Sequence, residues 1–190
     1  LSEPLRGVAV QEGIAVVAGS NRVHVVDVSD PAHPRELSTI DATVVRPVLA
    51  GDIALLGGTS PVLSVIGIGD PERPIRLGSW NPAPGGWGSD VVVDTERDLA
   101  YVGRSVPWQL YIPPPGPTCA PGGPTCTPTP RATRPPSEAW LHVVSLATPA
   151  APAGGRAWSF GGGDLRVSAV AIDPNRELAL LGILSDGSLE

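Results

Sequence analysis

Short apolar runs alternate with turn-forming residues along most of the chain, and the same order of runs returns several times. The segment 25–34, VVDVSDPAHP, returns at 65–74 as VIGIGDPERP, and a weaker copy, VVSLATPAAP, occupies 143–152. In every copy two prolines lie three positions apart, directly after a run rich in Val, Ile or Leu. A residue before proline avoids helical angles, so each copy predicts a β-strand followed by a turn. Asp30 and Asp70 are predicted to stabilise their turns through side-chain hydrogen bonds.

Other short strands accompany this segment in each repeat. A second apolar run precedes it, at 13–19, 52–58, 98–103 and 177–182. First strands are predicted at 8–10, 44–49, 91–93 and 170–172, and fourth strands at 35–40 and 75–80. The hairpins 94–98 and 173–177 also agree with each other. Four strands in roughly 40 residues is typical of a β-propeller blade. We therefore predict an all-β fold, a β-propeller fragment, with an open β-solenoid or a sandwich as the structural alternative.

The repeats divide one domain, residues 1–190, into three complete four-stranded blades and the start of a fourth. The predicted blades span about 6–41, 42–80, 89–158 and 166–190. Propellers close with roughly four to eight blades. We therefore expect this segment to pair with the remaining blades of a longer chain. Purified alone, it is expected to oligomerise or aggregate through exposed strand edges.

The best copy of the repeat also carries a family resemblance. Residues 23–34, VHVVDVSDPAHP, closely fit the pattern L/V-x-V-V/I-D-V-S-D-P-x-x-P, so the sequence resembles the LVIVD-repeat family. The second copy has Gly67 in place of the first Asp, and the third copy has Ser145 and Thr148 in place of both. The resemblance covers most of the chain outside 104–139. It implies a β-propeller from surface or secreted bacterial and archaeal proteins, and it brings no catalytic residues.

A proline-rich insert, residues 104–139, interrupts the third blade between its second and third strands. Proline at this density favours polyproline II or irregular structure. The two cysteines, Cys119 and Cys126, lie within it and form either a small disulfide or two free thiols.

The insert also marks one face of the predicted propeller. Loops between second and third strands share this face with the connections between blades. Trp87, Trp108 and Phe160 fall there without repeat partners, and with Arg104 they form the candidate binding face. Trp80 and Trp158 occupy matching blade positions and are predicted to pack between blades.

Composition supports sheets and argues against two classes of partner. Hydrophobic residues make up 42% of the chain and are mostly Val, Leu, Ala and Ile, with one Phe and no Met. The net charge is −6, and no basic stripe is present, so we expect no nucleic-acid partner. No apolar run is long enough to predict a membrane-spanning segment.

Candidate chemistry is sparse. His24 and His142 share one strand position in different blades, so they are not expected to meet at a metal. The residues aligned at the starts of the innermost strands are Gly7, Arg46, Asp90 and Ala169. One acid and one arginine do not form a general acid–base pair. We predict no catalytic residues, no metal site and no cofactor.

The sequence favours a non-catalytic binding module of the cell surface or extracellular space, with a protein or glycan ligand. One alternative is part of a propeller hydrolase or lyase whose active site is completed by other blades. Another is a structural spacer in a large repeat protein. The sequence leaves the identity of the ligand open.

Overall fold

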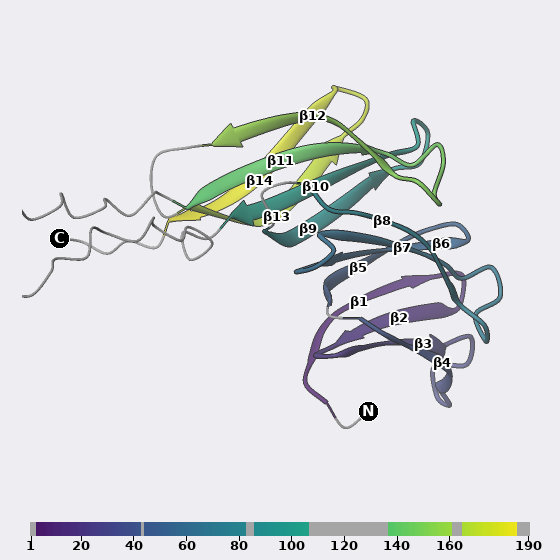
Figure 1. The fold of residues 1–190 in the computed structure, drawn as a ribbon. Helices are drawn as coiled ribbons and strands as arrows, with labels where there is room; N and C mark the ends of the chain where they lie inside the picture. The colour runs from purple at the N-terminus through teal and green to yellow at the C-terminus, as the bar shows by residue number, and fades with distance from the viewer. Residues whose placement is uncertain (1–2, 43, 83–85, 107–136, 161–164, 186–190) are drawn as a thin grey trace, which may run out of the picture.

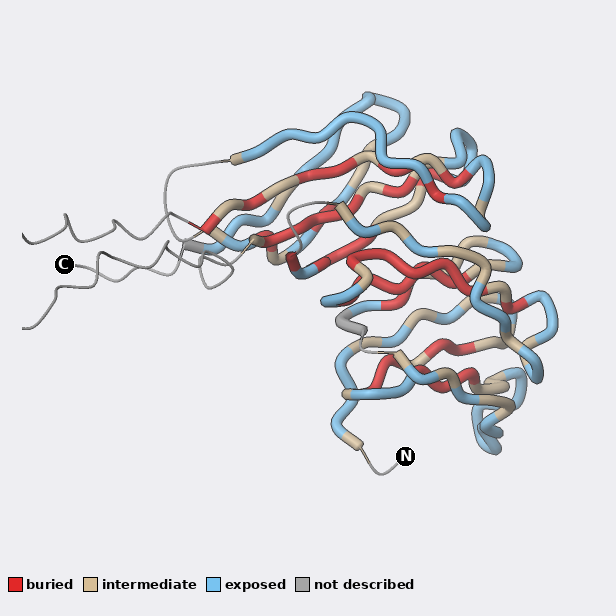
Figure 2. Tube along the Cα trace, in the orientation of Figure 1, coloured by how far each residue is buried: buried red, intermediate tan, exposed pale blue. Residues whose placement is uncertain are grey.

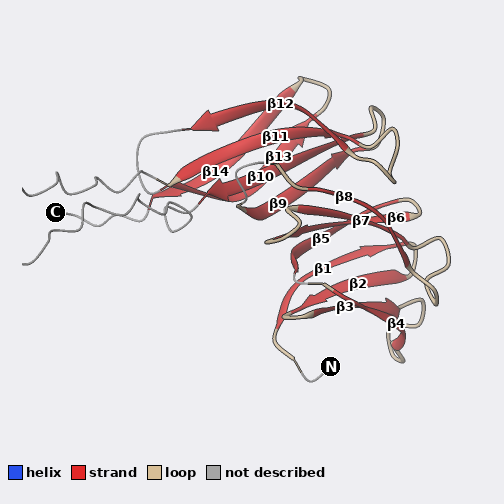
Figure 3. Cartoon of the chain, viewed as in Figure 1, coloured by secondary structure: helices blue, strands red, loops and turns tan. Residues whose placement is uncertain are grey.

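Only β-strands and turns form in the part of the chain described by the computed structural model, residues 3–42, 44–82, 86–106, 137–160 and 165–185 (Figure 3). The strands form four successive antiparallel sheets, which we call blades one to four (Figure 1). Blade one holds β1 (Leu5–Gln11), β2 (Ile14–Gly19), β3 (Arg22–Asp27) and β4 (Arg35–Asp41). Blade two holds β5 (Val44–Ala50), β6 (Ile53–Gly58), β7 (Leu63–Gly67) and β8 (Ile75–Trp80). Blade three holds β9 (Trp87–Asp94), β10 (Leu99–Val106), β11 (Glu138–Ser145) and β12 (Ala153–Phe160). Blade four holds β13 (Leu165–Asp173) and β14 (Leu178–Ser185).

The strand order within each blade follows the chain, and the blades meet along their first strands. Contacts join β1 to β5, β5 to β9 and β9 to β13, so these four strands are the innermost ones. Three complete four-stranded blades and the start of a fourth are therefore confirmed. One boundary differs from the prediction, because β10 continues to Val106 and β11 already begins at Glu138. Both ends of the predicted insert 104–139 are thus strand residues that pair with each other.

The turns form as the repeated polar residues predicted. In blade one the Asp30 carboxylate accepts a hydrogen bond from the Ala32 amide at 3.0 Å, and in blade two Asp70 accepts one from Glu72 at 3.1 Å. Between first and second strands the chain adopts left-handed angles, with φ of 80° at Gly13. Such angles suit glycine, and they reverse the chain in a very short turn.

The apolar cores lie between blades rather than within one sheet. One core combines Leu55, Leu63 and Val65 of blade two with Val102 and Val144 of blade three. A second core joins blades one and two, and a third joins blades three and four. Figure 2 shows buried residues mainly on the second and third strands of blades one to three, whereas β12 at the outer edge is largely exposed.

The faces at the two ends of this array have no neighbouring blade among the described residues. Val8 and Val10 on β1 are both 62% exposed, and Leu180 on β14 is 66% exposed. None of the described residues belongs to a helix that is long and apolar enough to cross a membrane.

Candidate binding site at the start of the innermost strands

Each innermost strand carries a β-bulge near its beginning. The pairing shifts by one residue at the same place in all four blades, and it leaves one extra residue in each strand: Arg6, Val45, Ser89 and Ser168. A bulge bends the strand and redirects the side chains beside it. The residues directly after the bulges are Gly7, Arg46, Asp90 and Ala169, the same four that the repeat alignment placed together.

Asp90 connects three blades at this level. Its buried carboxylate accepts hydrogen bonds from the backbone amide of Val170 on β13, at 2.8 Å, and from that of Val91, at 3.1 Å. A guanidinium nitrogen of Arg46 on β5 lies 3.6 Å from the same carboxylate. A buried carboxylate requires such partners, since burial without them is costly. Asp90 therefore links blade three to blade two through Arg46 and to blade four through Val170.

Ser105 makes a second link between blades three and four. Its hydroxyl oxygen accepts a hydrogen bond from the Val167 amide at 3.0 Å and lies 3.3 Å from the hydroxyl of Ser89. Both serines are thereby held beside the bulges of β9 and β13. The hydroxyl groups of Ser89 and Ser105 therefore lie close together where blades three and four meet.

A cavity of about 260 Å³ opens between the bulges of β5, β9 and β13. Its walls combine an aromatic ring, two guanidinium groups, hydroxyls and backbone from three blades. They include Trp87, Arg46, Arg166, Ser89, Ser105 and Ser168. The Trp87 side chain is 40% exposed, so part of its ring is open to a ligand. The cavity combines one aromatic surface with several hydrogen-bond donors. We call it the axial cavity.

Arg104 does not lie on this surface, contrary to the prediction. It is 1% exposed, and its guanidinium carbon lies 5.5 Å from the centre of the Trp140 ring, in a cation–π contact. Burial lowers the pKa of Arg104, and the negative charge of Glu138 partly opposes that change. The prediction failed because β10 extends past this residue, so Arg104 is part of a strand in the packed sheet.

Two aromatic residues of the predicted face, Trp87 and Phe160, do not lie together at one site. Trp87 and Phe160 lie at the same end of blade three, in one row of paired residues that also contains Ser105 and Ala139. They occupy opposite edges of that sheet, because β9 is the first strand and β12 the last. Phe160 packs against the core between blades three and four. Trp108, Cys119 and Cys126 lie outside the described residues.

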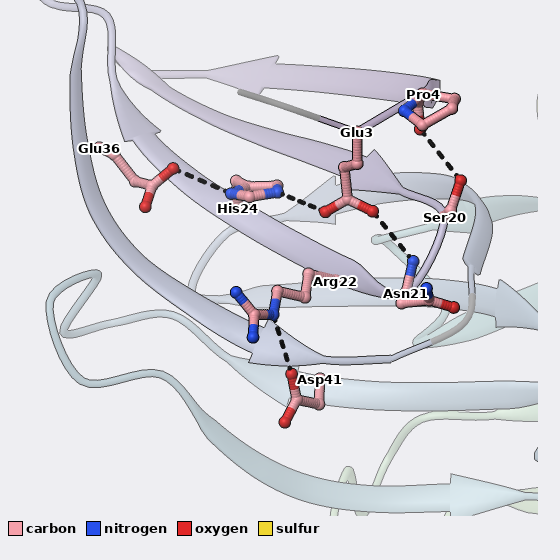
Figure 4. Close-up of polar contacts among 8 residues, drawn as sticks. All are labelled: Glu3, Pro4, Ser20, Asn21, Arg22, His24, Glu36 and Asp41. Carbon is pink, nitrogen blue, oxygen red and sulfur yellow. Dashed lines mark hydrogen bonds and ion pairs between the residues drawn. The ribbon is translucent and has the colours of Figure 1, made fainter.

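The two aligned histidines differ in their surroundings. His24 on β3 is buried, and its ring nitrogens each lie 2.9 Å from a carboxylate oxygen, one of Glu3 and one of Glu36 (Figure 4). His142 on β11 packs between Trp80, edge to face at 5.0 Å, and Trp140, stacked at 5.7 Å. Its Nε2 atom is buried and has no hydrogen-bond partner. Burial, followed by the positive charge of Arg104, lowers the pKa of His142 from 6.5 to about 4.

The described residues contain no group of three or more His, Cys, Asp or Glu side chains placed to hold a metal ion. Sequence reasoning singled out Trp87 but missed Ser89, Ser105 and Arg166. The sequence signal for these residues is their position beside the aligned starts of the first strands. This signal is weak, because polar residues are also common in exposed turns.

This architecture defines a class of protein. Antiparallel four-stranded sheets that follow each other around their first strands are the blades of a β-propeller. Residues 5–42, which cover blade one, match the family model of the LVIVD repeat, and this confirms the resemblance for that blade. No curated protein matches the chain.

Solved structures show the same fold at low sequence identity. The computationally designed Ika4 protein is 12% identical with a TM-score of 0.59, and the match covers 98% of this chain and 94% of that one. For the designed Ika8 protein the values are 13% and 0.54, covering 97% of this chain and 46% of that one. The extracellular domain of a hybrid two-component system from B. thetaiotaomicron is 11% identical with a TM-score of 0.55, and the match covers 95% of this chain. The chain spans only 20% of that bacterial domain.

Proposed function

We propose that this protein is a non-catalytic binding module of the cell surface or extracellular space, and that it binds a glycan at the axial cavity. The observation that carries this proposal is the half-exposed ring of Trp87 beside the guanidinium and hydroxyl groups of three blades. Sugars present apolar faces that stack on aromatic rings and hydroxyls that bond to such groups. The LVIVD repeat and the likeness to an extracellular domain support the location.

The geometry favours binding over catalysis. The buried Asp90 follows the cavity-lining Ser89 in the chain but does not itself line the cavity, and its two oxygens accept hydrogen bonds from Val91 and Val170. With its oxygens engaged by two backbone amides and facing Arg46, the carboxylate is poorly placed to contact a ligand directly. Asp90 therefore acts in this proposal as a support for the cavity wall.

Replacing Trp87 by alanine tests the cavity. We expect Trp87→Ala to weaken glycan binding about tenfold or more, because a central aromatic contact commonly dominates a binding site. The measurement is a screen of immobilised neutral and uronic-acid glycans, followed by titration calorimetry with the best of them. Trp158→Ala is the matched control, since Trp158 is 46% exposed but does not line this cavity. Equal affinity of the two variants would overturn the proposal.

A second variant separates the cavity from the insert. Val106 pairs directly with Glu138, so an Asn-Gly turn in place of residues 107–137 joins the two strands without changing their register. Glycan binding that survives this change but not Trp87→Ala assigns the ligand to the cavity. If no glycan binds and a cell-surface protein is captured only when the insert is present, the ligand is a protein and the insert recognises it.

A further inference from the structure

Arg46 brings a positive charge to the axial cavity from the innermost strand of blade two. Its side chain is 53% exposed and lines the cavity, whereas the side chain of its ion-pair partner Asp90 is 9% exposed and does not line it. The closest nitrogen and oxygen of the pair are 3.6 Å apart, which is too long for a hydrogen bond. A ligand in the cavity therefore meets the guanidinium and not the carboxylate.

The hydrogen-bond donors of Arg46 are not used up by its surroundings. Within the described part of the chain, the contact with Asp90 is the one polar contact of the Arg46 side chain. The two oxygens of Asp90 already accept hydrogen bonds from the amides of Val91 and Val170. Asp90 thus orients the guanidinium by its charge, and the planar fork of N–H donors stays available to a ligand.

The hydroxyl groups around the cavity are better placed to accept hydrogen bonds than to donate them. Ser168 donates its proton to a backbone carbonyl oxygen of β14 at 3.0 Å. The hydroxyl oxygens of Ser89 and Ser105 are 3.3 Å apart, so one of the two donates to the other. An acceptor group on a ligand therefore finds its donors chiefly in the guanidinium groups that line the cavity.

The charge of the cavity wall is opposite to that of the chain as a whole. The sequence carries a net charge of −6, but no carboxylate is among the described residues that line the axial cavity. Its charged lining residues are Arg46 of blade two and Arg166 of blade four, and Trp87 lies on the blade between them. Fixed positive groups around an opening attract an anion and repel a cation.

We propose that the glycan bound at the axial cavity is a uronic acid, whose ring stacks on Trp87 and whose carboxylate binds the guanidinium of Arg46. This inference rests on the proposed function and adds the class of sugar and the residue that selects it. A carboxylate suits this position because its two oxygens can accept parallel hydrogen bonds from one guanidinium plane. The hydroxyls of the sugar ring can donate to the oxygen of Ser168.

Oligosaccharides that differ only in charge test this inference on the intact protein. Oligomers of galacturonic, glucuronic and mannuronic acid are each titrated as the free acid and as the methyl ester, near neutral pH. We expect the best-bound free acid to bind at least about tenfold more tightly than its ester, because a hydrogen-bonded ion pair is lost on esterification. The difference should shrink at about 1 M salt, which screens exposed charges.

Variants of Arg46 show whether this residue selects the acid. Arg46→Gln should weaken binding of the free acid at least about tenfold and change binding of the ester by less than about twofold, so that the preference disappears. Arg46→Lys keeps the charge but loses the planar fork, and it should give an intermediate preference. Arg22→Gln is the matched control, because Arg22 is 60% exposed in an ion pair with Asp41 and does not line the cavity.

Urea unfolding of each variant checks that loss of binding is not loss of the fold, since Arg46→Gln removes the ion-pair partner of Asp90. If that variant does not fold, Arg46→Lys carries the test, and an unchanged preference in it contradicts the role of Arg46. Equal binding of acid and ester, or a tighter complex with a sulfated oligosaccharide of the same backbone, overturns the uronic-acid inference and leaves the proposed function standing. Failure to bind any glycan, neutral or acidic, overturns both.

Discussion

Lowering the pH from 6.5 to 4 is expected to reduce the free energy of unfolding by about 3 kcal/mol through His142 alone. The folded protein holds this imidazole neutral down to a pKa of about 4, whereas the unfolded chain binds the proton near pH 6.5. The unfolded state therefore binds more protons between these values. The stabilising contribution is complete above pH 6.5 and is lost as the pH falls toward 4.

Urea unfolding at a series of pH values measures this effect. His142→Phe keeps an aromatic ring between Trp80 and Trp140 and should remove most of the additional slope between pH 6.5 and 4. His33→Gln is the matched control, because the His33 side chain is 84% exposed and its loss should leave the slope in place. If His142→Phe retains the wild-type slope, the imidazole is protonated in the folded protein and its burial has no such effect.

Asp90→Ala is expected to lower the free energy of unfolding by about 3 kcal/mol. The change leaves the buried amide of Val170 without its acceptor and removes the carboxylate that faces Arg46. Asp90→Asn should cost less, because the side-chain carbonyl still accepts one hydrogen bond. The measurement is denaturant unfolding at neutral pH.

The matched control for this prediction is Asp41→Ala. Asp41 also forms an ion pair, at 3.3 Å with Arg22, but its side chain is 91% exposed. An exposed pair of this kind contributes at most about 1 kcal/mol. Equal losses from Asp90→Ala and Asp41→Ala would mean that the link between the blades at Asp90 adds no more stability than a surface contact.

The sequence was sufficient for the blades because each strand and turn is encoded locally. Alternating apolar residues, the Asp-Pro turns of Asp30 and Asp70, and the hairpins after Asp94 and Asp173 recur in every matching unit, and the structure forms strands and turns at those places. The alignment of Arg46 with Asp90 also followed from the repeat. Their ion pair did not, because it depends on how one blade is rotated against the next.

The candidate site was harder to predict because its residues come from three blades. Arg104 shows this difficulty: a charged residue near a proline-rich segment suggests an exposed loop, but the pairing of Arg104 with Gly88 and Trp140 keeps it inside the sheet. For Trp158 the error is the opposite one, because its ring was expected to pack between blades and is instead 46% exposed. Its sequence position matches that of Trp80, and only the neighbouring sheet decides whether the ring is covered.

The placement of the apolar cores between sheets has a consequence for how the protein unfolds. Each core among the described residues takes side chains from two adjacent blades, so the smallest cooperative unit is a neighbouring pair of blades. Within the described part of the chain, blades two and three each contribute to two of these cores, whereas blades one and four contribute to one. Opening of blade two or blade three therefore disrupts two of these cores, and this central pair should be the last of the four described sheets to open.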